Sequence, residues 1–250
     1  MSAGEILAIA FAGLAAGTIN TVVGSGTLIT FPVLLAFGYA PVTANVSNTV
    51  GLVPGSISGA YGYRRELAGQ GGSVRRLGVA ALAGGVTGAA LLLVLPSAAF
   101  RAIVPVFIAL ALVLTVAQPR INLLLARRAG GQEQRGGVLT PLVVYLTGVY
   151  GGYFGAAQGI MLLAILGVVL AQDLQRSNAL KNVLAGLVNG VAGVYFICAA
   201  DVRWLPALLI ACGSIAGAQL GARYGRRLPP RALRALIVAV GISAIVQLLL

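Results

Sequence analysis

Long stretches without a charged residue constrain this chain more than any other feature. These stretches cover residues 6–63, 77–100, 102–119, 136–172, 182–200, 204–222 and 235–250. A helix that crosses the hydrocarbon core of a bilayer needs about 20 consecutive apolar residues, and most of the stretches are long enough. With 59% hydrophobic and only 9% charged residues, the chain cannot form a water-soluble surface. The sequence therefore predicts an all-α polytopic membrane protein.

The basic residues indicate which ends of the apolar stretches face the cytoplasm, because Lys and Arg are enriched in short cytoplasmic loops. We expect four groups of them on that side: Arg64, Arg65, Arg75 and Arg76; Arg120, Arg127, Arg128 and Arg135; Arg176 and Lys181; and Arg223, Arg226, Arg227, Arg231 and Arg234. Arg101 and Arg203 then fall in short outer connections. The groups do not form a face interleaved with aromatic residues, so the net charge of +12 indicates topology and not nucleic-acid binding.

This topology predicts six simple crossings, at residues 41–63, 73–95, 99–118, 177–199, 204–222 and 232–250. The remaining segments, 4–37 and 137–170, must each enter and leave on one side. Each has 34 residues, whereas two full crossings need about 40 residues plus a turn. We therefore expect two re-entrant hairpins of half-helices, broken at the glycine-rich residues 17–26 and 148–159. For residues 4–37, one long helix broken in the middle is the alternative. Both termini are expected outside.

The two halves of the chain share this order of elements. Corresponding residues are 131 or 133 positions apart: Gly17 and Gly148, Gly24 and Gly155, Asn45 and Asn178, and Val50 and Val183. Each half makes three net crossings, and an odd number inverts the second half relative to the first. We expect an N-terminal repeat at 1–118, a cytoplasmic linker at 119–136 and an inverted C-terminal repeat at 137–250. Many secondary transporters are built from inverted repeats with discontinuous helices, and bind substrate near the midplane.

Three motifs carry a resemblance to a known family. They are GTINTVVGSGTLITFPVLLAFGYAPVTANVSNTV at residues 17–50, GVYGGYFGAAQGIMLLAILG at 148–167 and RSNALKNV at 176–183. Together they resemble the TauE/SafE sulfite exporter family, and the resemblance covers nearly the whole chain. It implies a transporter of the bacterial inner membrane that exports sulfite, sulfoacetate or related sulfonates. The chain departs from the usual glycine runs where Ser25 and Thr27 flank Gly26, and where Gln158 precedes Gly159.

An oxyanion that leaves water needs hydrogen-bond donors in the middle of the membrane. The N–H groups of glycine-rich breaks and of helix N-termini are suitable donors. The candidates in the first half are Asn20, Thr21, Gly24, Ser25, Gly26 and Thr27 at the break, with Asn45 and Asn48 in the next helix. In the second half they are Gly152, Gly155, Gln158 and Gly159, with Asn178 and Asn182. The alternative is that the polar residues bond neighbouring helices and the glycines permit close packing.

Lys181 is the only lysine in the chain, and it lies about a turn and a half inside a predicted helix. We expect it to supply positive charge to the anion; the alternative is that it extends to the cytoplasmic headgroups.

Two further sets of glycines recur every four residues: Gly51, Gly55 and Gly59, and Gly213, Gly217 and Gly221. They predict close helix packing.

The five acidic residues lie at segment ends or in loops: Glu5, Glu66, Glu133, Asp173 and Asp201. A carboxylate proton relay across the membrane is therefore disfavoured. The chain has no His and two Cys, so we expect no metal or other cofactor. An intramembrane enzyme is disfavoured for the same reason.

The expected partners are a small anion and the lipid bilayer, and a homodimer is one assembly open to the chain. A channel-like pore, or a permease for another small anion, is the alternative to a carrier.

Overall fold

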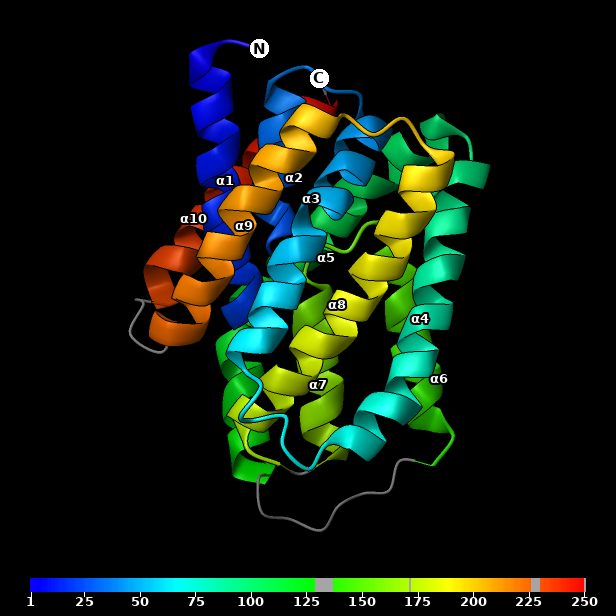
Figure 1. The fold of residues 1–250 in the computed structure, drawn as a ribbon, viewed down its shortest axis with the longest axis vertical. Coiled ribbons are helices and arrows are strands. Elements are labelled where there is room, and N and C mark those ends of the chain that lie inside the picture. Colours follow the sequence, from blue (N-terminus) through cyan, green and yellow to red (C-terminus); the bar gives the residue numbers. More distant parts are fainter. Residues whose placement is uncertain (129–136, 171, 226–229, 250) are drawn as a thin grey trace.

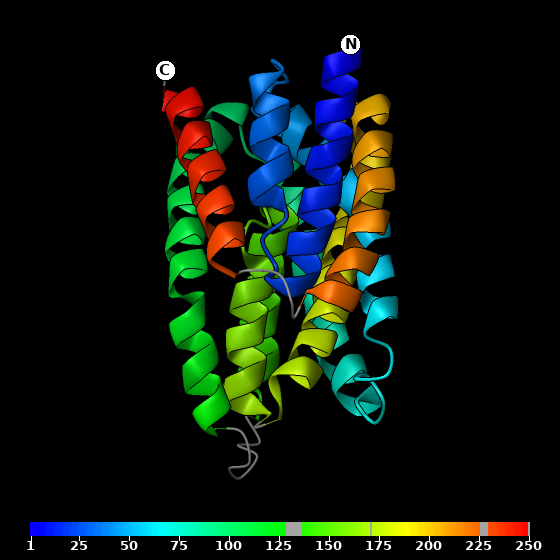
Figure 2. The ribbon, with the colours of Figure 1, turned by 90° about the vertical axis from the view of Figure 1, so that its left-hand side faces the viewer.

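The computed structural model describes residues 1–128, 137–170, 172–225 and 230–249, and these residues form ten α-helices. No strand occurs among them. The helices run roughly along one long axis (Figures 1 and 2). Five of them are long and apolar enough to cross a membrane: α1, α4, α5, α8 and α9. The all-α polytopic class predicted from the charge-free stretches is thus confirmed.

The helices in chain order are α1 Ala3–Val22, α2 Thr27–Ala36, α3 Pro41–Gly62, α4 Gly71–Val94, α5 Ser97–Arg128, α6 Leu139–Tyr153, α7 Gln158–Val169, α8 Leu174–Ala199, α9 Trp204–Tyr224 and α10 Pro230–Leu249. Helices form at all six predicted crossings. For α3, α4, α8, α9 and α10 the bounds agree with the prediction within three residues. Proline at or near the first position of α3 and α10 suits a helix start, where its missing N–H leaves no bond unmade.

The helix of the third predicted crossing runs into the predicted linker at 119–136. Helix α5 continues through Pro119 and ends at Arg128, ten residues after the predicted end of this crossing at 118. Apolar residues continue the helical pattern after the proline, including Ile121, Leu123 and Leu124. A proline removes one backbone bond but does not prevent a helix that packs elsewhere along its length. Residues 129–136 of the predicted linker lie outside the described residues.

Two short breaks interrupt the apolar segments at residues 23–26 and 154–157. In Figure 2, α2 returns from the first break toward the end of the molecule that holds the N-terminus, and α7 returns from the second toward the opposite end. The first pair of helices is unequal, because α1 has 20 residues and α2 has 10. Our expectation of two half-helices in this segment is therefore wrong for α1, which by length alone could cross a bilayer.

Both breaks are shorter than the glycine-rich stretches that predicted them. Gly17 and Gly148 lie inside α1 and α6, where the missing side chain lets another helix approach. A Cβ on Gly17 would lie 2.3 Å from the carbonyl oxygen of Ser214, and one on Gly148 would lie 2.9 Å from that of Ala81. These glycines serve packing, so glycine content alone placed the start of each break too early.

The same turn ends α1 and α6. Gly24 and Gly155 have φ angles of +93° and +77°, which a residue with a side chain adopts only with strain. The N–H of Gly24 donates to the carbonyl of Ile19 at 3.0 Å, and the N–H of Gly155 donates to that of Tyr150 at 3.1 Å. Both pairs agree with the spacing of 131 residues. This bond over five residues is typical of a glycine-terminated helix.

Glycines hold two helix pairs in close contact, α1 with α9 and α6 with α4. On α9, a Cβ on Gly213 would lie 2.3 Å from Ala10 O and one on Gly217 would lie 2.0 Å from Leu14 O. On α4, a Cβ on Gly88 would lie 2.0 Å from Val149 O. The prediction that the glycines spaced by four residues form packing faces is confirmed, and it extends to Gly51, Gly55 and Gly59, which face Ala207, Ser214 and Thr21 respectively.

The N-terminus and the end of α10 lie at the same end of the molecule (Figures 1 and 2). The short α4–α5 and α8–α9 connections lie at that end too, and the α3–α4 connection lies at the opposite end. Gln70 fixes this last connection to α8, since its Nε2 donates to the carbonyl oxygens of Glu66 at 2.8 Å and Arg176 at 3.1 Å.

Candidate functional site

The two breaks meet in the interior of the molecule. The N–H of Gly159 donates to the carbonyl of Gly24 at 3.1 Å. A Cβ on Gly24 would lie 2.4 Å from Gly159 Cα, and one on Gly159 would lie 2.5 Å from Gly24 Cα. Only glycine at both positions permits this approach. Because α2 begins at Thr27 and α7 at Gln158, the contact brings the N-terminal ends of both helices to one region.

These helix starts leave several backbone donors unused. Neither α2 nor α7 has a side-chain cap at its N-terminus. Among the residues that the structure describes, the N–H groups of Ser25, Gly26 and Thr27 have no acceptor, and neither do those of Ala156 and Ala157. A helix N-terminus carries partial positive charge, and free N–H groups there are a ready site for an anion.

Two buried side chains beside these helix starts also lack a partner. The hydroxyl of Ser25, a residue that is 1% exposed, makes no hydrogen bond, and neither does the Nε2 of Gln158, which is 3% exposed. Buried polar groups in folded proteins are nearly always bonded, because an unpaired group loses its water without compensation. Both groups can donate to an oxyanion.

Asn48 joins α3 to the start of α2. Its Nδ2 donates to Thr27 Oγ1 at 3.4 Å, and its Oδ1 accepts from Thr30 Oγ1. Thr30 was absent from the candidates, although its position one turn after Thr27 could have indicated it. Asn48 therefore lies against the site, with its own amide already used.

Lys181 lies deep inside the protein with no exposed surface. Its Nζ donates to the carbonyl oxygens of Asn20 and Thr21, at 3.1 Å each. The amides of Asn178 and Asn182 both donate to Thr21 O at 3.3 Å. These are the last carbonyls of α1, which carry partial negative charge, so a cation is well placed there. The alternative that Lys181 extends to the headgroups is wrong.

In the second half, Asn45 closes the end of α6, since its Nδ2 donates to Tyr153 O at 3.0 Å. Asn45 and Asn178 thus have equivalent contacts, each with the first helix of the other half. The Oδ1 atoms of both are buried without a partner.

The two candidate glycines of this half have different places. Gly155 lies in the break itself. Gly152 lies within α6 and packs against α4, where a Cβ on Gly152 would be 2.3 Å from Gly85 O.

The structure therefore assembles the candidates into two groups. Gly24, Ser25, Gly26, Thr27, Gly155, Gln158 and Gly159 form the meeting point of the breaks. The four candidate asparagines of α3 and α8 all donate to other groups of the protein: Asn45 to Tyr153 O, Asn48 to Thr27 Oγ1, and Asn178 and Asn182 to Thr21 O. Asn20 and Thr21 contribute backbone carbonyls to Lys181. Aromatic residues pack beside the second break, with the Phe31 and Phe154 ring centroids 5.2 Å apart.

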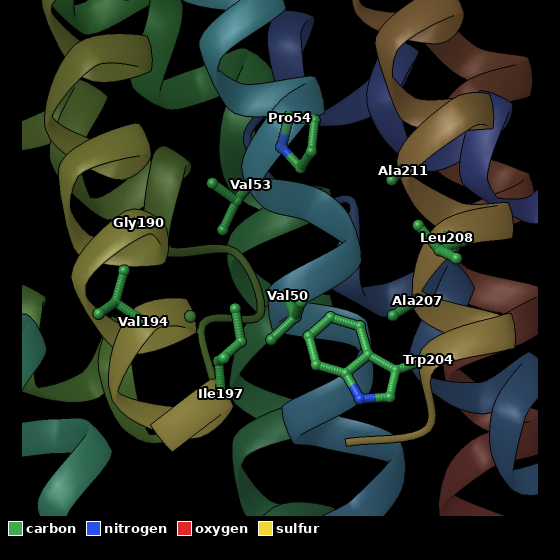
Figure 3. Close-up of a pocket in the computed structure, with 11 residues that line it drawn as sticks. Val50, Val53, Pro54, Gly190, Val194, Ile197, Trp204, Ala207, Leu208 and Ala211 are labelled. Carbon is green, nitrogen blue, oxygen red and sulfur yellow. The ribbon is translucent and has the colours of Figure 1, made fainter. Parts of the chain in front are cut away.

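Two cavities of about 270 and 500 Å³ lie elsewhere, along α3 and α8. Figure 3 shows the first, an apolar space where Val50 and Val53 of α3 lie between Val194 and Ile197 of α8 on one side and Trp204 and Leu208 of α9 on the other. Val194, Trp204 and Leu208 are exposed, so this cavity opens on the surface of the protein. Neither cavity is lined by a candidate residue for the anion site.

Interrupted helices that meet inside a bundle of long apolar helices are typical of membrane transport proteins. Comparison with known proteins agrees with this class. The sequence model of the sulfite exporter TauE/SafE family matches residues 9–248, and the chain belongs to that family. The resemblance noted in the three motifs is thereby confirmed.

Curated relatives have names of the same class. The probable membrane transporter protein ORF9 of Sinorhizobium sp is 30% identical, over 98% of this chain and 93% of the relative. The probable membrane transporter protein YfcA of Escherichia coli K12 is 26% identical, over 92% and 84%. A probable membrane transporter protein of Haemophilus influenzae is also 26% identical, over 88% and 85%. Comparison with solved structures gives no match.

Proposed function

We propose that the protein is a secondary transporter that exports small sulfur-containing oxyanions, such as sulfite or organosulfonates, across the bacterial inner membrane. The substrate binds where the two breaks meet and is reached alternately from each side. The observation that carries this proposal is the contact between Gly24 and Gly159, which joins two helix N-termini from opposite ends of the molecule. Both termini favour negative charge, and water would be displaced from both.

The surrounding groups suit an oxyanion in number and in chemistry. The free N–H groups of residues 25–27, the hydroxyl of Ser25 and the Nε2 of Gln158 can all donate. Lys181 adds a cation whose partners among the described residues include no carboxylate, so its charge is available to a substrate. A buried charge without a counter-ion is costly, and a bound anion would offset that cost.

Corresponding contacts in the two halves support an inverted repeat. Helix α1 packs on α9 through glycines as α6 packs on α4, and the same turn follows α1 and α6. Asn45 and Asn178 each donate to a carbonyl at the end of the first helix of the opposite half, Tyr153 O on α6 and Thr21 O on α1. In such a repeat the two halves exchange conformations, so that the site opens first to one side and then to the other.

The arginine-rich α3–α4 connection lies at the end of the molecule opposite the N-terminus. By the positive-inside rule this end faces the cytoplasm and both chain ends face outward. Export of an anion from a cell that is negative inside is favoured by about 2.3 kcal/mol per charge for each 100 mV, so the membrane potential is a sufficient driving force.

Flux measurements on purified protein in liposomes test the proposal. Sulfite, sulfate, sulfoacetate and thiosulfate would be compared, each with labelled anion inside and unlabelled anion outside. A carrier gives saturable flux and exchange that is faster than net efflux. Unsaturable single-channel currents would support the channel-like pore instead, and no flux of any small oxyanion would contradict the proposal.

A further inference from the structure

Lys181 occupies a position whose counterpart in the other half holds no cation. Its Nζ lies 3.1 Å from Asn20 O and from Thr21 O. A shift of 131 residues carries these carbonyls onto those of Gly151 and Gly152, near the end of α6. Within the described residues neither of these two carbonyls accepts a hydrogen bond, because the N–H groups of Phe154 and Gly155 both donate to Tyr150 O. The end of α6 therefore has two free carbonyls where α1 has an ammonium.

The side chain that corresponds to Lys181 cannot fill this position. At the spacing of 133 residues that relates Asn45 to Asn178, Lys181 corresponds to Asn48. The amide of Asn48 is bonded to Thr27 and Thr30 on α2. The negative end of the α6 dipole is thus left without the cation that the negative end of α1 has.

A third unpaired oxygen belongs to Asn45, whose amide is held at the end of α6. Asn45 is fully buried, and its Nδ2 donates to Tyr153 O, the next carbonyl along α6. The Oδ1 of the same amide has no partner. This unpaired acceptor is an independent observation, because a buried carbonyl oxygen normally accepts a bond from protein or water.

The chemistry of these oxygens selects a monovalent cation. All three are neutral, whereas Ca²⁺ and Mg²⁺ sites use carboxylates, and transition metals use imidazole or thiolate ligands. Among the described residues, no group of three His, Cys, Asp or Glu side chains could hold a metal ion. Transporters with discontinuous helices bind sodium through the carbonyls of half-helix C-termini.

We propose that a sodium ion binds at the end of α6 to Gly151 O, Gly152 O and Asn45 Oδ1. This inference rests on the proposed function, because the ion then lies beside the anion site across from Lys181. Because the two ligands carry opposite charges, each raises the affinity of the other, and thermodynamic linkage makes the two effects equal. A divalent oxyanion that moves with one sodium ion keeps a net negative charge, so the membrane potential still drives its export.

The first test measures anion flux in liposomes that contain sodium or choline at equal ionic strength. We expect sodium to lower the half-saturating anion concentration about tenfold, within the usual range of coupling between sites. Asn45→Ala should remove this effect. Asn189→Ala should keep it, because Asn189 bonds Ser56 on α3, outside the site.

A variant at the corresponding position tests the correspondence itself. Asn48→Lys places an ammonium at the position equivalent to Lys181 and removes the bond to Thr27, so we expect lower anion flux than in the wild type, and the remaining flux should no longer respond to sodium. Titration of the purified protein with NaCl provides a readout independent of transport and of anion. We expect saturable binding that Asn45→Ala abolishes and Asn189→Ala retains.

The outcomes separate the two proposals. Anion flux that is equal in sodium and choline would overturn the sodium site and leave the proposed function intact. Saturable sodium binding that persists in Asn45→Ala would also overturn the site, whether or not the protein transports. Absence of anion flux together with Asn45-dependent sodium binding would contradict the proposed function while supporting the ion site.

Discussion

At the scale of single residues, the buried ammonium of Lys181 distinguishes this interior from an ordinary helix bundle. It is fully buried and bonded to two backbone carbonyls at the end of α1. Such a group is costly in a membrane unless a helix end and a ligand compensate it. Asn48 is bonded to the start of α2. Lys181 therefore holds the helix that leads into the first break, and Asn48 holds the helix that leaves it.

Lys181→Ala and Asn48→Ala should each lower anion flux while leaving membrane insertion intact. A hydrogen bond to a charged group contributes about 1.5–3 kcal/mol, so we expect a loss of roughly tenfold to 100-fold for Lys181→Ala. For Asn48→Ala the loss should be about tenfold or less, because its bonds are between neutral groups. Flux per inserted protein in liposomes is the measurement. Wild-type rates in either variant would remove that residue from the site.

Gly24→Ala should lower both thermal stability and flux. The new Cβ would meet Gly159 at 2.4 Å, in addition to the strain of a φ angle of +93°. Gly38→Ala is the matched control, because Gly38 has a φ of +80° but no atom within 4 Å of its Cβ position. We expect the control to cost only the backbone strain, about 1–2 kcal/mol.

The melting temperature and flux of both purified variants decide this comparison. If Gly24→Ala were no worse than Gly38→Ala, the contact between the breaks would not be required for the fold or for transport.

At the scale of helices, the close pairing of α1 with α9 holds the first break in place. Gly217→Val should disrupt this pair, since its Cβ would lie 2.0 Å from Leu14 O. Gly190→Val on α8 is the control, as no atom lies within 4 Å of its Cβ position. We expect a marked fall in melting temperature for the first variant and little change for the second. Equal melting temperatures would contradict the packing role of this glycine.

The sequence predicted the helices well because a membrane span needs a long apolar run, which is visible without any tertiary information. It predicted the breaks less well. Gly17, Gly148 and Gly152 pack against other helices, whereas Gly24 and Gly155 end helices, and composition does not separate the two uses. Only contacts with residues far along the chain make the distinction.

The candidate site was predicted in part for the same reason. Glycines and polar residues at the breaks are brought together, but the partners of the α8 side chains could not be foreseen. Lys181 and Asn178 bond backbone carbonyls that lie 157 or more residues away. A backbone carbonyl carries no signature in the sequence, so the bonds of these side chains to the end of α1 could not be predicted.

At the scale of the whole molecule, the topology gives a direct prediction. Both chain ends should face outward, because the arginine-rich α3–α4 connection lies at the opposite end. Ser2→Cys, in a chain whose exposed Cys198 and Cys212 are replaced by alanine, should react with an impermeant thiol reagent in intact cells. Labelling that occurs only after lysis would overturn this orientation.

The meeting of the two breaks as an anion site is tested most directly by substrate protection. Ser25→Cys places a thiol at the start of α2, and a maleimide should label it when the site opens. We expect a transported sulfonate to slow this labelling, with half-protection at the concentration that half-saturates flux. Labelling that is unaffected by a saturating concentration of the sulfonate would contradict binding at the breaks.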